Sequence, residues 1–422
     1  MTTAMVRGRA RHAVAAVWAV LFLWGLVGVV QRLTAGHAYT AYGSYVPWGL
    51  WVSAYIYFIG LSAGAFLLSS LVYVFRLKDL QRVGRVALFV AALTLGMALV
   101  SIWFDLGHMA RFYEVFTRPN FKSLMAWMVW LYTAYVCLIL AELWFETRCD
   151  LDTFARRGGP LAPVYRALAL GWRCPESPEA LAACHAQSRR WLRVLGSIGV
   201  PLAVTFHGGV GALFATVAAR PYWHSALYPI FFLTGALLSG GGLLLAVVAG
   251  LDIVSEEERA RIVRRLTRFV VGLLLFDLVL EWSEFSIPLW YGVGEELDVL
   301  KTVLFGPYWW VFWIVHLLMG AGVPLWLLLR RPGDRRAVAW AGGLVALTYM
   351  AVRLNLVIPA QLEPALRGLE RAFVDARLVF HYVPSLHEWS VVAFIVSTGA
   401  AVFYLGMRFL PLVPVRAEEG GA

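Results

Sequence analysis

Charged residues and cysteines are scarce in this sequence, and each shortage excludes a class of protein. Only 15% of the 422 residues are charged and 60% are apolar, whereas soluble domains are about one-quarter charged. With a mean hydropathy of +0.70, a water-soluble fold would be unable to bury its apolar surface. The four cysteines form no Cys-x-x-Cys pair, no haem c motif and no iron–sulfur set. We therefore expect free thiols, no metal, no haem and no iron–sulfur cluster bound by this chain.

Long apolar runs recur along the whole chain. A helix needs about 20 apolar residues to cross a bilayer, and lipid requires the backbone to satisfy its own hydrogen bonds. The runs lack the alternation of barrel strands. The sequence therefore predicts an all-α, polytopic membrane protein of about ten transmembrane helices. We expect the spans at 13–31, 47–75, 84–107, 123–146, 192–217, 223–250, 267–290, 307–329, 337–358 and 386–409.

The net charge of +10 raises the question of nucleic acid, but the positions of the basic residues argue against it. Most of the 36 Lys and Arg fall in the N-terminal segment, in alternate connections and in the C-terminal segment. This bias is typical of the cytoplasmic side of membrane proteins, where basic segments also contact anionic lipid. We expect both termini to be cytoplasmic, no nucleic acid partner, and a first span that is retained as a helix.

Two of the predicted spans share a block of small residues followed by three apolar ones. The blocks are Ser62-Ala63-Gly64-Ala65 and Ser239-Gly240-Gly241-Gly242, and such residues let helices approach closely in lipid. Because four spans separate the blocks, the two halves would be parallel repeats. We expect one membrane domain over 1–422, with four-helix bundles at 47–217 and 223–358 and peripheral helices at 13–31 and 386–409.

Ionisable residues inside a membrane are functional candidates by default, because they are costly to bury there. Asp105 and His207 lie in the outer parts of predicted spans, and His108 follows Asp105 closely. A quinone needs an apolar cleft and a proton-exchanging group at a carbonyl, and Trp51 and Tyr55 are available to line a ring slot. The alternative is structural: Asp105 would anchor a helix end, and His207 would bond between helices.

The span 267–290 carries three carboxylates on one helical face, at Asp277, Glu281 and Glu284. Carboxylates one turn apart relay protons through water, so these residues, together with His316 and Arg353, form a candidate proton path. The alternative is an ion pair between Arg353 and Glu281 or Glu284. A single histidine pair on non-adjacent helices, formed by His207 and His316, is a poor basis for haem b.

The segment after the third span resembles a known family. It reads Asp-Leu-Gly-His-Met-Ala-Arg-Phe over 105–112, then Pro-Asn-Phe-Lys-Ser-Leu-Met-Ala-Trp over 119–127. This resembles the signature of the NrfD/PsrC family, the membrane subunits of polysulfide reductase and its relatives. Further stretches resemble the ten-helix branch, with HybB-type subunits of a nickel–iron hydrogenase and subunits of alternative complex III. These stretches are 47–51, 207–240, 353–355 and 382–388.

The resemblance implies a menaquinone or ubiquinone site near the outer face, with Asp105 and His207 as site residues, in a bacterial or archaeal cytoplasmic membrane. It also implies docking of a ferredoxin-like iron–sulfur subunit, beside a catalytic or cytochrome subunit. The residues that would face this partner are Arg111, Phe112, Lys122 and Ser123. The main hypothesis is thus a quinone-handling subunit that is not catalytic alone. The rivals are a secondary transporter using Glu281, Glu284 and Arg353, and a purely structural membrane anchor.

Overall fold

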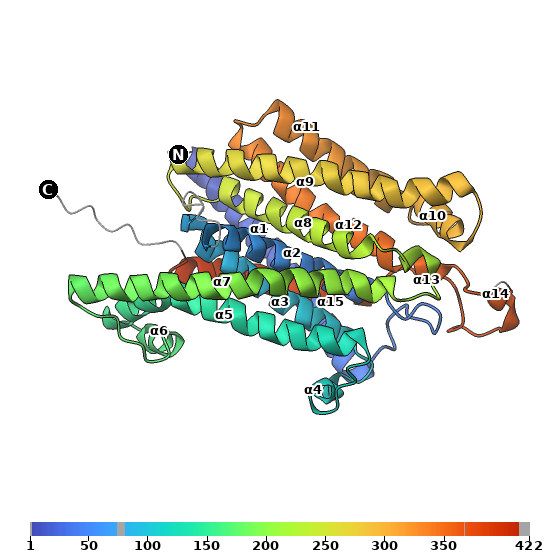
Figure 1. The fold of residues 1–422 in the computed structure, drawn as a ribbon, viewed down its shortest axis with the longest axis horizontal. Helices are drawn as coiled ribbons and strands as arrows, with labels where there is room; N and C mark the ends of the chain where they lie inside the picture. The colour runs from blue at the N-terminus through green and yellow to red at the C-terminus, as the bar shows by residue number, and fades with distance from the viewer. Residues whose placement is uncertain (1, 74–80, 367, 413–422) are drawn as a thin grey trace.

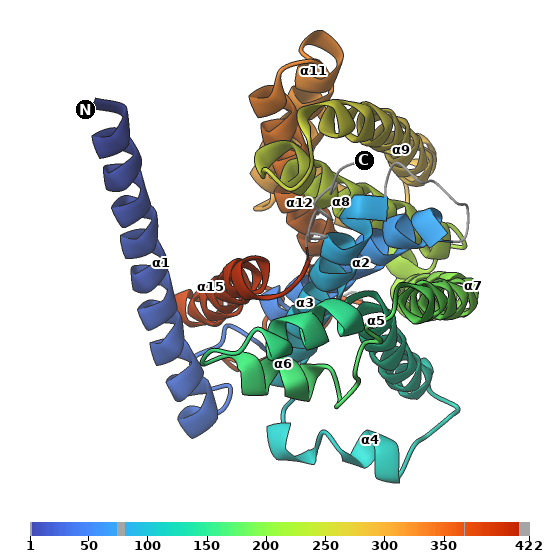
Figure 2. The same ribbon diagram turned by 90° about the vertical axis from the view of Figure 1, so that its left-hand side faces the viewer.

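The computed structural model describes residues 2–73, 81–366 and 368–412, and within these ranges every regular element is a helix. Most of the long helices lie side by side and roughly parallel (Figure 1), whereas the N-terminal helix crosses them at an angle (Figure 2). Their bounds are α1 Thr2–Ala35, α2 Leu50–Tyr73, α3 Gln81–Asp105, α5 Leu124–Arg156, α7 Pro178–Ala215, α8 Tyr228–Gly250, α9 Glu256–Tyr291, α12 Arg335–Val357 and α15 Leu386–Phe409. The shorter elements are α4 Glu114–Thr117, α6 Ala162–Leu168, α10 Glu295–Phe305, α11 Val323–Arg330, α13 Pro359–Leu362 and α14 Leu369–Ala372.

Nine helical segments in the described part of the chain are long and apolar enough to cross a membrane. This confirms a polytopic membrane protein. The expected span 267–290 lies within α9, a helix of 36 residues, but α9 is not among the nine because its carboxylates and arginines make it more polar. The expected span 47–75 begins at Leu50 in the structure, and its last two residues lie outside the described ranges.

Side chains fix where several helices begin. The Ser123 hydroxyl accepts a hydrogen bond from the backbone N–H of Met125 and caps α5, and Ser177 caps α7 in the same way. Ser255 begins α9 with a capping box, which satisfies two otherwise unpaired backbone donors. A left-handed residue, Gly292 with φ +67°, ends α9, as is usual at helix C-termini.

The helices form two neighbouring groups. α2, α3, α5 and α7 contact one another, and α8, α9, α11 and α12 contact one another, while α2 and α8 meet between the groups. Seen end-on, α1 leans against α15 at the edge of the first group (Figure 2). Figure 1 shows α10, α13 and α14 at the right-hand end of the molecule, α4 at its lower edge beside the start of α5, and α6 toward the left. We call the side on which α3 ends and α5 begins, and on which α4 lies, the α4 end.

The two small-residue blocks contact each other where α2 crosses α8. A Cβ atom on Gly64 would lie 2.0 Å from the carbonyl oxygen of Ala236, and one on Gly240 would lie 2.6 Å from the Cα atom of Gly64. Real Cβ atoms do not approach this closely, so only glycine allows this backbone contact. The small residues thus join the two groups.

Several helices extend beyond their predicted ends, as α1, α5, α7 and α9 show. α5 continues to Arg156 and α7 already begins at Pro178, so the connection between the predicted spans 123–146 and 192–217 shortens to 157–177. The physical reason is that polar residues beyond the apolar run continue a helix as readily as apolar ones, and hydropathy does not report them.

Candidate functional site

A first polar group lies at the α4 end, where α1, α3 and the segment before α2 meet. The Tyr42 hydroxyl donates a hydrogen bond of 2.9 Å to Oδ1 of Asp105. Arg32 donates from Nε to the Phe104 carbonyl at 2.7 Å and from Nη2 to the Leu106 carbonyl at 2.6 Å. The guanidinium is buried and caps the last carbonyls of α3. Asp105 is therefore held between a phenol donor and a nearby cation.

The electrostatics of this first group depend on burial. Burial and the nearby Asp105 carboxylate hold the pKa of Tyr42 well above its ordinary value, so this phenol keeps its proton and acts as a donor. Burial and the positive charge of Arg32 lower the pKa of His37, so His37 is neutral near pH 7. The His37 ring lies 5.6 Å from the Tyr42 ring and 5.9 Å from that of Trp51.

Trp51 and Tyr55 both lie on α2, but only Trp51 lies in the first polar group. Trp51 is fully buried and donates from Nε1 to the Glu388 carbonyl at 3.1 Å. Tyr55 instead shares a short hydrogen bond with Tyr132 of α5. His108 is exposed just beyond α3, and no described contact joins it to Asp105.

A second polar group lies between α9, α12 and the π-helical segment η4, Val311–Gly322, which precedes α11. The Tyr349 hydroxyl lies 3.2 Å from each carboxylate oxygen of Asp277. Nε2 of His316 lies 3.0 Å from Oε2 of Glu281. Glu284 accepts a short hydrogen bond from Ser225. The carboxylate face predicted from the spacing thus points into the protein, and each carboxylate has its own partner.

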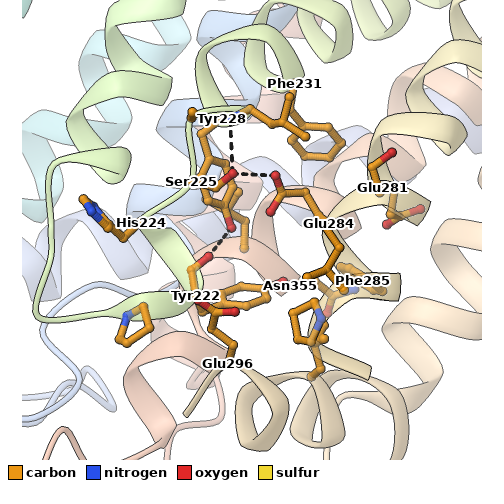
Figure 3. A pocket seen from close by; sticks show the side chains of 18 of the residues that line it. Tyr222, His224, Ser225, Tyr228, Phe231, Glu281, Glu284, Phe285, Glu296 and Asn355 are labelled. Atoms are coloured by element: carbon orange, nitrogen blue, oxygen red, sulfur yellow. Dashed lines mark hydrogen bonds between the residues drawn. The ribbon is translucent and has the colours of Figure 1, made fainter. Parts of the chain in front are cut away.

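A cavity of about 410 Å³ opens beside this second group (Figure 3). It lies between α9, α10, α12 and the segment that precedes α8. Glu281 and Glu284 both line it, as do Glu296 of α10 and Asn355 of α12. Neither side-chain polar atom of Asn355 has a partner in the described part of the chain. A cavity of this size, with several polar groups, is roomy enough for ordered water.

Arg353 and His207 are completely buried, and their side-chain nitrogens have no hydrogen-bond partner among the described residues. The ion pair between Arg353 and Glu281 or Glu284, which was the alternative to a proton path, is therefore not formed among the described residues. Glu281 and Glu284 are bonded to His316 and Ser225 instead. The Cζ atom of Arg353 lies 4.3 Å from the centre of the Phe232 ring and 5.1 Å from that of the Tyr349 ring. His207 also borders Phe232, with ring centres 6.3 Å apart, so it lies near the second group and not beside Asp105.

The segment between α3 and α5 is exposed at the α4 end. Arg111, Phe112 and Lys122 are exposed, and Ser123 is half-buried as the cap of α5. Phe112 leaves 54% of its surface accessible. Aromatic and Arg side chains are typical of binding surfaces, so this segment stays the candidate partner surface.

Sequence reasoning missed several members of these groups. Tyr42 and Arg32 lie 63 and 73 residues before Asp105, and no local pattern joins them to it. Cys149, Cys174 and Cys184 also gather, with their sulfur atoms all within 4.8 Å of one another. Their irregular spacing gave no signal of this. The one available signal was that Arg32 and Tyr42 lie close to the ends of the predicted spans 13–31 and 47–75.

The fold and the buried side chains thus define a polytopic membrane protein with two groups of ionisable residues inside it, one of them at a helix end. The family model described as polysulphide reductase, NrfD, matches residues 39–365. The chain therefore belongs to the NrfD family, as the motif at 105–112 predicted.

Known members of the family cover most of this chain. A selenate reductase subunit from Mesobacillus selenatarsenatis is 37% identical over 405 residues, which is 94% of each of the two proteins. The Hdr-like menaquinol oxidoreductase integral membrane subunit of Archaeoglobus fulgidus is 28% identical, covering 89% of this chain and 87% of its own length. The menaquinone reductase integral membrane subunit of Nitratidesulfovibrio vulgaris is 22% identical, covering 94% of this chain and 91% of its own length.

Proposed function

We propose that this chain is the integral membrane subunit of a quinone-linked respiratory oxidoreductase complex and handles menaquinone or ubiquinone at the α4 end. The observation that carries the proposal is the hydrogen bond from Tyr42 to Asp105 at the end of α3. It places a carboxylate and a phenol together at one end of the apolar helices. The names of the relatives from Archaeoglobus and Mesobacillus support the class, because both are subunits of oxidoreductases.

The residues of the first polar group fit a quinone headgroup. Asp105 is half-buried, so its carboxylate can accept a proton and pass it to water. Tyr42 orients the carboxylate and Arg32 offsets its charge. The ring of Trp51 lies 5.8 Å from that of Tyr42 and makes this side of the group aromatic. A bound quinone supplies two-electron chemistry coupled to protons; this chain's part is to position Asp105 and to move the proton.

The partner in this proposal is a ferredoxin-like iron–sulfur subunit, itself attached to a catalytic or cytochrome subunit. It would dock on the exposed segment from Arg111 to Lys122, which directly follows Asp105 in the chain. Docking there would hold the iron–sulfur centre of the partner close to a quinone bound beside Asp105. We also propose that the α4 end faces away from the cytoplasm, with both termini on the cytoplasmic side.

The finer architecture belongs to the same proposal. α9 would be the tenth membrane-crossing helix, and the two groups of contacting helices would be four-helix bundles of a parallel repeat over 47–217 and 223–358. Support comes from the matching positions of Gly64 and Gly240 in α2 and α8 and from their contact. The helices α1 and α15 would be additions outside the repeat.

The second polar group is proposed as a proton path. The cavity borders Glu281 and Glu284, and Glu281 contacts His316. One helical turn before Glu281 on α9, Asp277 contacts Tyr349. His207 and Arg353 would lie at the inner end of this path. The specific observation that favours it is a cavity lined by three carboxylates, one of which, Glu281, also contacts the buried His316.

The test of the quinone proposal is to purify the complex and to measure quinol oxidation or quinone reduction by the Asp105→Asn variant. We expect turnover to fall by about 10²-fold or more, because the variant cannot exchange a proton. Asp298→Asn, at an exposed position on α10 of the same end and outside the proposed docking segment, is the matched control and should retain activity. Unchanged turnover in Asp105→Asn, or a pure preparation with no iron–sulfur subunit, would contradict the proposal and favour the transporter or the structural anchor.

A further inference from the structure

Three of the four cysteines converge at the opposite end of the first helix group, far from the α4 end in sequence and fold. Cys149 lies near the end of α5, Cys174 in the connection after α6, and Cys184 near the start of α7. Cys174 and Cys184 are buried and Cys149 is half-buried. The sulfur atoms of Cys149 and Cys184 lie 3.4 Å apart, and all three sulfurs lie within 4.8 Å of one another.

We propose that Cys149, Cys174 and Cys184 bind a zinc ion. Zinc–thiolate bonds are about 2.3 Å long, so the sulfurs of a tetrahedral site lie about 3.8 Å apart. The separation of 3.4 Å and the upper limit of 4.8 Å are both close to this value, so small side-chain rotations would form the site. We assign the fourth position to water. The proposal is independent of the quinone proposal.

A buried arginine beside the sulfurs supports an anionic site. Arg148 is 2% exposed, and no carboxylate among the described residues lies within ion-pair distance of it. Its Nη2 atom instead lies 3.8 Å from the sulfur of Cys184 and 3.0 Å from the hydroxyl of Ser188. Three thiolates and one Zn²⁺ carry a net charge of about −1. Arg148 would balance this charge, whereas three neutral thiols would leave a buried cation unpaired.

The connection that carries Cys174 is held in place by side chains of α5. The backbone N–H of Cys174 donates to Oδ2 of Asp152 at 2.8 Å, and Arg156 donates to the carbonyl of Cys174 at 2.6 Å. Trp172 stacks on Arg148, with Cζ 4.1 Å from the ring centre. These contacts fix the position of Cys174 between the two helices. A zinc ion bound by the three cysteines would link the connection 157–177 to α5 and α7.

The proposal differs from the expectation from sequence that these cysteines hold no metal. That expectation rested on their spacing, since paired two-residue spacings are typical of zinc sites in loops. Here Cys149 and Cys184 lie on two long helices, α5 and α7, and only the packing of these helices brings the two residues together. Each thiol would lose its proton on binding, so zinc affinity should rise with pH.

The first experiment measures zinc in the full-length protein, purified in its complex without chelators. We expect about one zinc per chain in the wild type and at least about tenfold less in Cys149→Ser, Cys174→Ser and Cys184→Ser. Cys137→Ser is the matched control, because Cys137 is exposed on α5 outside the cluster, and it should keep its zinc. Wild-type zinc no higher than in the triple Cys149/Cys174/Cys184→Ser variant would overturn the proposal.

A second experiment uses the wild-type protein and so does not depend on how the variants fold. N-ethylmaleimide labelling followed by mass spectrometry should find the three cysteines protected, and a zinc chelator should expose them, while labelling of Cys137 stays the same. Protection that survives the chelator but not a reductant would show a disulfide and overturn the proposal. Arg148→Gln should weaken zinc retention by about 10- to 100-fold, whereas Arg157→Gln, an exposed control, should not.

Discussion

The hydroxyl of Tyr349 lies 3.2 Å from both carboxylate oxygens of Asp277, so one phenol on α12 serves a buried carboxylate on α9. A third helix makes the contact possible. A Cβ atom on Gly235 of α8 would lie 1.9 Å from that hydroxyl, so only glycine leaves room for it. The bond joins α9 to the rest of its group, although α9 is the most polar of the long helices.

Tyr349→Phe should destabilise the protein and lower any activity that depends on Asp277. The change removes the described hydrogen-bond donor of a carboxylate that is 3% exposed, and an unsatisfied buried acceptor costs about 1–3 kcal/mol. Thermal unfolding of the purified complex measures the loss. Tyr291→Phe is the matched control, since Tyr291 is 73% exposed. Equal unfolding temperatures for the two variants would show that the bond has no net value.

Gly64→Val should destabilise the contact between the two helix groups. The new side chain would begin 2.0 Å from the Ala236 carbonyl oxygen, and overpacking typically costs about 1–3 kcal/mol or more. We expect a lower yield of folded protein and a lower unfolding temperature. Gly96→Val on α3 is the control, because a Cβ atom there has no neighbour within 4 Å. The prediction fails if both variants lose the same stability.

The sequence predicted helices and their polar faces well, because apolar runs and carboxylate spacing are local properties. It placed Gly64 and Gly240 at close contacts for the right physical reason, but it could not show that they touch each other. Nor could it pair Asp277 with Tyr349, or His316 with Glu281, since partner choice depends on helix rotation. The π-helical segment around His316 has no local sequence signal, and it turns this side chain toward α9.

Partners that come from distant segments were missed for the same reason. Tyr42 and Arg32 precede the first helix group in sequence, and only the packing of α1 and the segment after it brings them to Asp105. The grouping of Cys149, Cys174 and Cys184 was also missed. Their spacing was uninformative because α5 and α7 extend past the apolar spans and bring Cys149 and Cys184 together.

His37 should make the first polar group sensitive to acid. Burial and Arg32 lower its pKa in the folded protein, so below the ordinary value of about 6.5 the unfolded chain binds a proton that the folded chain does not. Stability therefore falls as the pH drops below about 6.5. His37→Gln should flatten this dependence in unfolding measured between about pH 7 and pH 5.5, and His12→Gln, at an exposed position on α1, should leave it unchanged. An unaltered slope in His37→Gln would assign the effect to another group.

Glu281→Gln should separate proton movement from electron transfer. The variant keeps the shape of the cavity wall but removes the charge that faces Nε2 of His316 at 3.0 Å, so a relay through Glu281 loses its proton-binding group. In liposomes containing the complex, we expect proton translocation to fall by about 10²-fold, while quinol-linked electron transfer changes by less than about twofold. Glu296→Gln, in the same cavity on α10, is the control and should translocate normally.

A double-mutant cycle with His316→Gln decides whether Glu281 and His316 act as one unit. If protons pass between them, the double variant should be no worse than either single one, which gives a coupling of about 0.5–3 kcal/mol. Additive losses would mean that each residue acts alone. Normal proton translocation in Glu281→Gln would show that the contact between Glu281 and His316 is only structural. Proton uptake that needs no quinol would instead support the transporter, because a quinone-linked subunit moves protons only when electrons pass.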